Sequence, residues 1–145
     1  MSMPAFGRSY KMDLLRNVPL FRSLNQRQLN AVARYTDAHR ARPGAVLTKK
    51  GQHGLEAFFI VDGKARVEVS GKKIAELGPG DFIGELSIID GKPRTATVIA
   101  QTPMTLMVVR RRDFRFLRDS VPGLQEKLLL TLCERLRQAD QALTH

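Results

Sequence analysis

The sequence has a single cysteine, no tryptophan and no long apolar run. One thiol, Cys133, cannot form an intrachain disulfide, so the chain has no sign of an oxidising compartment. No segment approaches the ~20 apolar residues that span a bilayer, and none has the layout of a secretory signal. We therefore expect a cytoplasmic protein without membrane insertion, in which Cys133 is a small buried apolar side chain.

Acidic residues are also scarce: 14 Asp and Glu stand against 24 Lys and Arg, for a formal net charge of +10. This excess admits nucleic acid, anionic membranes and small anionic ligands as partners. The basic residues are scattered and do not form the long block typical of a nucleic-acid-binding tail. A solvated basic surface is the plainest interpretation of the charge.

Groupings of catalytic or metal-ligating residues are missing as well. The histidines His39, His53 and His145 are far apart, and Ser87 has no histidine near it in the sequence. Nucleophilic catalysis needs a base close to the nucleophile, and metal sites need clustered ligands. We expect no enzyme, no metal and no cofactor.

What is present is enough chain for one domain: 145 residues and 16.3 kDa. Residues 1–10 show no apolar period and are expected to form a flexible N-terminus, with a single domain over 11–145. Asn25 and Gln28 have the spacing of a capping box, which predicts a helical segment ending near Ala38.

The middle of the chain is divided by glycines into short β-rich runs. The candidate strands are residues 45–48, 57–61, 65–69, 73–77, 95–100 and 104–109. A short helix around 114–117 and a break at Val121-Pro122-Gly123 follow. Leucines and alanines at helical spacing then mark a longer C-terminal helix with one apolar stripe: Leu124, Leu128, Leu132, Leu136, Ala139 and Leu143. The pattern predicts a mainly β fold, a jelly roll with flanking helices.

Residues 81–98 break the β-pattern inside this roll. A helical turn over 85–89 after Gly84 would present backbone N–H groups and the positive end of a helix dipole to an anion. Arg94, at the start of the next strand, offers an always-charged planar fork for phosphate, and the carboxylate of Glu85 could accept hydrogen bonds from a sugar hydroxyl.

The runs 82–87 and 93–98 closely resemble the phosphate-binding cassette of the cyclic-nucleotide-binding domain family. That family includes catabolite activator protein, protein kinase A regulatory subunits and cyclic-nucleotide-gated channels. The resemblance extends to Pro19-Leu20-Phe21, to the glycine-rich stretch 51–63 and to the closing helix. It implies a double-stranded β-helix with N-terminal helices and a C-terminal lid helix.

The resemblance also implies residue roles. Arg94 would pair with the cyclic phosphate, and Glu85 would bind the ribose 2′-hydroxyl. The backbone N–H groups that complete the phosphate cradle would belong to the residues around Gly84, Leu86, Ser87 and Thr95. Taken singly, Glu85 is equally explained as a helix N-terminal acid and Arg94 as a surface pairing partner.

Three cassette positions bear on the ligand. Ser87 stands where the family often has alanine, and Ile83 where phenylalanine is common, both expected on the cassette's rim. Thr95 follows Arg94, a position where threonine is associated with guanine preference in eukaryotic members. Bacterial members with serine or threonine there can still take cAMP, so cAMP is the favoured ligand and cGMP the alternative.

Contacts to the base are expected from two elements. Val67 and Ile74 would line the roll's inner face, while Leu132, Arg135 and Leu136 of the closing helix would cover the purine. The alternative is that the leucines are ordinary core and that Arg135 is solvated.

Together these features predict a stand-alone cAMP receptor whose lid helix closes over the ligand and signals to a downstream protein partner. A catabolite-activator-like regulator would need a helix-turn-helix segment of roughly sixty further residues, so nucleic acid is not an expected partner. The alternatives are a cGMP sensor, a basic nucleic-acid-associated module that has lost ligand binding, and a jelly-roll enzyme.

Overall fold

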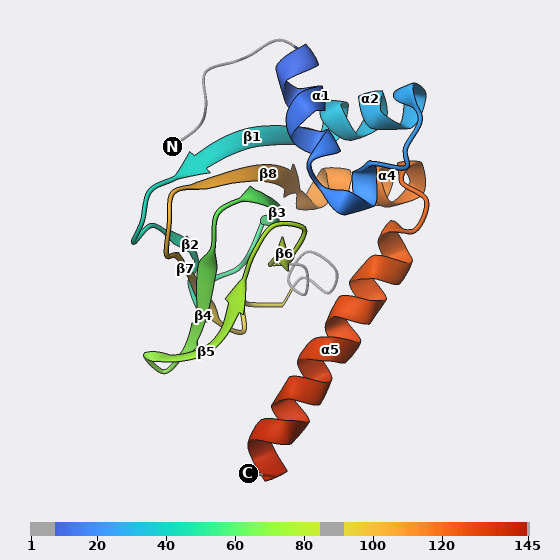
Figure 1. Ribbon diagram of the computed structural model, residues 1–145. Coiled ribbons are helices and arrows are strands. Elements are labelled where there is room, and N and C mark those ends of the chain that lie inside the picture. The colour runs from blue at the N-terminus through green and yellow to red at the C-terminus, as the bar shows by residue number, and fades with distance from the viewer. Residues whose placement is uncertain (1–7, 85–91, 145) are drawn as a thin grey trace.

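The computed structural model describes residues 8–84 and 92–144, and it consists of a β-roll with helices at one end (Figure 1). The elements, in chain order, are α1 (Arg8–Arg16), η1 (Pro19–Phe21), α2 (Gln26–Tyr35), β1 (Thr36–Ala41), β2 (Val46–Thr48), β3 (Glu56–Asp62), β4 (Ala65–Val69), β5 (Lys72–Leu77), β6 (Phe82–Ile83), β7 (Thr97–Ala100), β8 (Met104–Arg110), α4 (Arg111–Ser120) and α5 (Leu124–Thr144).

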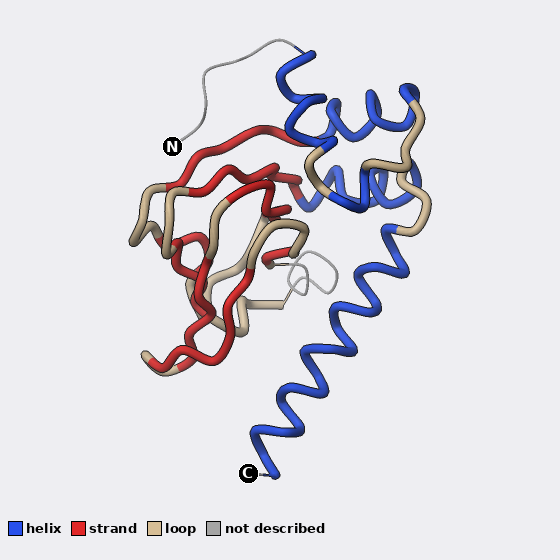
Figure 2. The backbone as a smooth tube through the Cα atoms, in the orientation of Figure 1, coloured by secondary structure: helices blue, strands red, loops and turns tan. Residues whose placement is uncertain are grey.

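The strands form two four-stranded antiparallel sheets, in the orders β1-β8-β3-β6 and β2-β7-β4-β5. Figure 2 shows the strands gathered in one body, with α1, α2 and α4 beside one end of it and α5 running along its side. This is the mainly β jelly roll with flanking helices that the sequence predicts.

Strand β3 explains how the layers are held together. Ala57, Phe59 and Val61 belong to a core shared with the helices, whereas Phe58 and Ile60 belong to a core between the sheets. Because β3 is buried on both faces, it is almost continuously apolar and does not alternate with polar residues. Within the helix-side core, the Phe59 ring makes edge-on contacts with two other phenylalanines, at centroid distances of 5.3 Å to Phe21 and 4.6 Å to Phe82.

The N-terminal helices differ from expectation at both ends. Helix α1 begins at Arg8, so three residues of the segment expected to be flexible are helical. The capping box of Asn25 and Gln28 is present at the start of α2. However, α2 ends at Tyr35, and Thr36–Ala41 is strand β1 rather than the end of a helix. The reason is non-local: β1 pairs with β8 along its whole length, a ladder that local periodicity does not reveal.

The C-terminal helix α5 leaves the body of the fold after its first turns (Figure 1). Leu124 and Leu128 are buried in the helix-side core, Leu132 is half-buried, and Leu136 is 64% exposed. Cys133 is exposed, so its expected burial is wrong: this part of α5 lies outside the core. Among the described residues, none of the helices combines the length and the apolarity that crossing a membrane requires.

Candidate functional site

Arg94 is 9% exposed, which is unusual for an arginine. Its backbone is held by the loop before β3: the Arg94 N–H donates to Gln52 O at 2.8 Å, and its carbonyl accepts from the Gly51 N–H at 2.9 Å. An isolated bridge between His53 and Pro93 continues this pairing. The loop thereby fixes the direction in which the Arg94 side chain leaves the backbone.

The guanidinium of Arg94 joins two other chain segments. Nη1 donates to the carbonyl of Gly84 at 2.9 Å, and Nη2 donates to the carbonyl of Glu56 at 2.6 Å. Gly84 ends the described part of the chain after β6, and Glu56 begins β3. Since these bonds involve a charged donor, they are stronger than neutral ones, and they tie Arg94 to the start of β3 and to the residue that follows β6.

Two glycines make room for this side chain. A Cβ atom on Gly54 or on Gly84 would overlap the Arg94 guanidinium. Gly84 also has φ +80°, a left-handed conformation that other residues rarely adopt. We call Gly54, Glu56, Gly84 and the guanidinium that they surround the Arg94 slot.

The structure brings Gly84 and Arg94 together as the sequence predicts, but it places other predicted residues differently. Ile83 has no exposed surface and packs in the core between the sheets, not on a rim. Thr95 is exposed directly after the buried Arg94. Glu85, Leu86 and Ser87 lie outside the described residues, as does the side chain of Arg135.

The two predicted base contacts from the roll also differ from each other. Val67 on β4 is half-buried and packs against the core between the sheets. Ile74 is 60% exposed, and it is the extra residue of a bulge, since Val67 pairs with Ala75 and Glu68 with Lys73. Leu132 is half-buried on α5.

Sequence reasoning missed Gly54 and Glu56. Gly54 lies in the glycine-rich stretch 51–63, so a signal was present, but its contact with Arg94 spans forty residues of chain. Glu56 acts through its backbone carbonyl, which no side-chain pattern can reveal.

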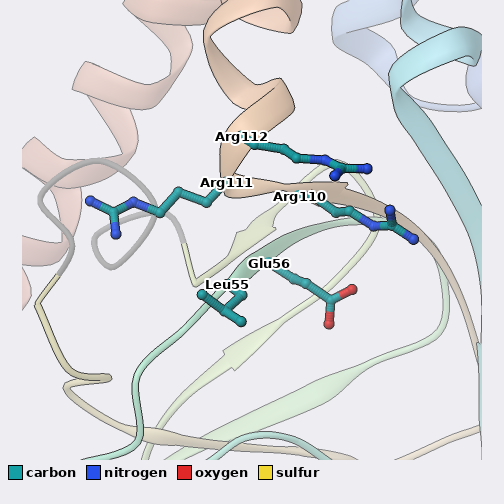
Figure 3. Close-up of a pocket in the computed structure, with 5 residues that line it drawn as sticks. All are labelled: Leu55, Glu56, Arg110, Arg111 and Arg112. Atoms are coloured by element: carbon teal, nitrogen blue, oxygen red, sulfur yellow. The ribbon is translucent and has the colours of Figure 1, made fainter.

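A second feature adjoins the slot. An open pocket of about 690 Å³ is lined by Leu55, Glu56, Arg110, Arg111 and Arg112 (Figure 3). We call it the arginine pocket. The Arg111 N–H donates to the carbonyl of Leu55 at 2.7 Å, and Glu56 lies opposite Arg110 in the β3–β8 ladder, so both walls are held by backbone pairing. In the part of the chain that the structure describes, no group of three or more His, Cys, Asp or Glu residues could hold a metal ion.

The family model for the cyclic nucleotide-binding domain matches residues 38–120, more than half of the chain. A cyclic nucleotide-gated potassium channel of Rhizobium etli is 37% identical over 131 residues, which cover 86% of this chain and 37% of the channel. The chain thus spans little more than a third of that relative's length.

Solved structures agree with this match. Thermus thermophilus catabolite activator protein is 28% identical, with a TM-score of 0.72, over 87% of this chain and 62% of that one. The regulatory domain of Toxoplasma gondii PKA, crystallised with cAMP, is 25% identical, with a TM-score of 0.70, over 86% and 50% of the two chains. On the family match and this shared jelly-roll fold, the chain belongs to the cyclic nucleotide-binding domain family.

Proposed function

We propose that this domain is a cytoplasmic cAMP receptor and not an enzyme, and that Arg94 binds the cyclic phosphate. The observation that carries the proposal is the Arg94 slot, in which a buried guanidinium is held between Glu56 at the start of β3 and Gly84. A guanidinium has five N–H donors in a planar fork, which matches the oxygens of a phosphodiester. The resemblance of the neighbouring sequence to the phosphate-binding cassette, and the cAMP in the T. gondii structure, support the same ligand.

The remaining contacts follow from the cassette. Glu85 binds the ribose 2′-hydroxyl, and the backbone N–H groups around Gly84, Leu86, Ser87 and Thr95 complete the cradle for the phosphate. Val67 and Ile74 contact the base from the roll.

The lid helix supplies the response. Beyond Leu128, α5 carries leucines that are half-buried or exposed, so it has apolar surface to place over a purine. The ligand binds better when α5 lies over the roll, so binding shifts the population from an open to a capped state. The change alters the surface that α5 offers to a downstream protein partner. Leu132 and Arg135 cover the base in the capped state.

Two alternatives to a cAMP receptor are each favoured by one observation. Thr95 is exposed beside Arg94, where its hydroxyl could reach a guanine, which favours cGMP. The net charge of +10 favours a nucleic-acid-associated module.

The test is calorimetric titration with cAMP and cGMP of the unchanged protein and of Arg94→Ala. We expect Arg94→Ala to lose on the order of 2–5 kcal/mol of binding free energy, about thirty- to several-thousand-fold in affinity, because a buried phosphate charge is left unpaired. Arg42→Ala removes an exposed arginine elsewhere and should bind normally.

Unchanged cAMP binding in Arg94→Ala would contradict the assignment. If cGMP binds more tightly than cAMP, cGMP becomes the proposed ligand, and Arg94 remains the proposed phosphate contact. Binding of a DNA duplex without either nucleotide would favour the second alternative.

A further inference from the structure

None of the described residues that line the arginine pocket is a proposed nucleotide contact, and Glu56 alone is shared with the Arg94 slot, through its backbone carbonyl. Its three arginines are consecutive and all exposed. Among the described residues, Arg110 and Arg111 form no ion pair, and Arg112 has only a long contact to Asp113 at 3.9 Å. Three neighbouring cations at the start of α4 are therefore available to an anionic partner.

The directions of the side chains decide which anion fits. Figure 3 shows Arg111 extending to one side of the start of α4, while Arg110 and Arg112 extend to the other. A single small anion cannot contact all three guanidinium groups in this arrangement. A chain with several carboxylates spaced along it can.

Leu55 and Glu56 narrow the choice further. Leu55 is 70% exposed in the pocket wall and offers an apolar contact. The carboxylate of Glu56 belongs to the same pocket and would repel any negative charge placed against it, so a ligand needs an uncharged position there, which the unbroken phosphates of a nucleic acid or an anionic membrane do not offer. A peptide can instead place an apolar side chain on Leu55 and keep its carboxylates near the arginines.

We propose that the arginine pocket is a docking surface for an acidic peptide segment of a partner protein, one with an apolar residue between its carboxylates. Arginine clusters are a recurring means of recognising acidic motifs, and arginine suits the planar geometry of carboxylates. Backbone pairing of Leu55 with Arg111 and of Glu56 with Arg110 holds the two walls of the surface in place.

The experiment uses a fluorescent peptide, acetyl-Glu-Glu-Leu-Glu-Glu, titrated with the protein in the absence of nucleotide and followed by anisotropy. The test variant combines Arg110→Gln, Arg111→Gln and Arg112→Gln. The matched control removes three exposed cations elsewhere: Arg27→Gln, Arg34→Gln and Lys72→Gln. We expect the test variant to bind about tenfold more weakly, because it loses three exposed charge pairs, and we expect the control to bind as the unchanged protein does.

Further measurements separate peptide docking from plain charge attraction and from nucleotide binding. Leu55→Asn should also weaken the peptide, whereas attraction by charge alone would leave that variant unaffected. Equal losses in the test and control variants would overturn the proposal, and so would displacement of the peptide by cAMP, which would make the pocket part of the nucleotide site. Binding of a short DNA duplex, or of vesicles of equal phosphatidylserine and phosphatidylcholine, through the three arginines without peptide binding would overturn it too. Because the peptide titration contains no nucleotide, its failure is distinct from a failure of cAMP binding.

Discussion

At the scale of single residues, the site depends on the Arg94 side chain and equally on two glycines, Gly54 and Gly84, that have no side chain to obstruct it. Arg94 reaches the carbonyls of Glu56 and Gly84 because Gly54 and Gly84 leave its guanidinium the space that a Cβ atom would take. The position of this charge is therefore set by Gly84, ten residues before it, and by the segment with Gly54 and Glu56, which lies far from it in the sequence.

Gly54→Ala should weaken cAMP binding, because the added methyl group must displace the Arg94 guanidinium from the slot. The matched control is Gly78→Ala, where an added Cβ atom meets nothing within 4 Å. We expect Gly54→Ala to lose on the order of tenfold or more in affinity, about 1.4 kcal/mol, by calorimetry. If both variants bind cAMP alike, the slot does not position Arg94 for the ligand.

At the scale of elements, α5 has two unlike parts. Its first two turns are anchored by Leu124 and Leu128 in the helix-side core, whereas Leu129, Leu130 and Leu136 are exposed. Helix periodicity predicts a continuous apolar stripe, but among its members with described side chains only Leu124 and Leu128 are buried. An anchored start and a projecting remainder suit a lid.

Because only the start of α5 is anchored in the core, leucine-to-alanine substitutions at its two ends should change the free energy of unfolding by different amounts. Leu128→Ala should lower the free energy of unfolding by about 2–5 kcal/mol, because it leaves a cavity in the core. Leu136→Ala, at an exposed position, should change it by no more than about 0.5 kcal/mol. Urea unfolding curves with matched slopes measure both, and similar losses would show that the C-terminal part of α5 is packed as well.

The hairpin of β4 and β5 carries the one carboxylate with a clearly shifted pKa among the described residues. The hydrogen bond and the charge of Lys73, with Nζ 3.1 Å from Oε2, lower the pKa of Glu76, and Lys64 adds to this at 3.7 Å. A lowered folded-state pKa stabilises the protein above the ordinary carboxyl pKa. That contribution disappears as the pH falls through the folded-state value.

Lys73→Gln should therefore raise the pKa of Glu76 toward its ordinary value, because the largest cause of the shift is removed. A carboxyl NMR titration of Glu76 measures this directly. Lys49→Gln, an exposed lysine on another loop, is the control and should leave the titration of Glu76 unchanged. An identical midpoint in all three proteins would rule out Lys73 as the cause.

At the scale of the whole molecule, the proposed response is movement of α5 against the roll. Cys133 is the sole cysteine of the sequence and is exposed on α5, so it can carry a spin label without other changes to the helix. Lys72→Cys, on an exposed strand of the roll, supplies a second label. Saturating cAMP should shift the label-to-label distances to shorter values, because the ligand favours the capped state.

Adding Arg94→Ala to the doubly labelled protein provides the control, since it should abolish the shift at the same cAMP concentration. Distances that stay the same while calorimetry shows cAMP bound would mean that α5 does not act as a lid.

Much of the architecture could be predicted because short stretches of sequence determine it. Glycine punctuation and short β-rich runs predict a jelly roll, and the strands at Ala65–Val69 and Met104–Arg110 lie within a residue of the expected bounds. The capping box at Asn25 is confirmed for the same reason. Strand β6 is not among the predicted strands, because its two residues lie within the run that resembles the cassette.

The sequence by itself determined the fold class and singled out Arg94 and Gly84, because periodicity, turn chemistry and motif spacing are properties of short stretches of chain. Only the tertiary structure decided that Thr36–Ala41 is a strand, that Ile83 is core, that Cys133 is exposed, and that Gly54 and Glu56 hold the arginine. Each of these depends on which distant segment lies alongside, and cross-sheet pairing and packing settle that only when the whole chain has folded.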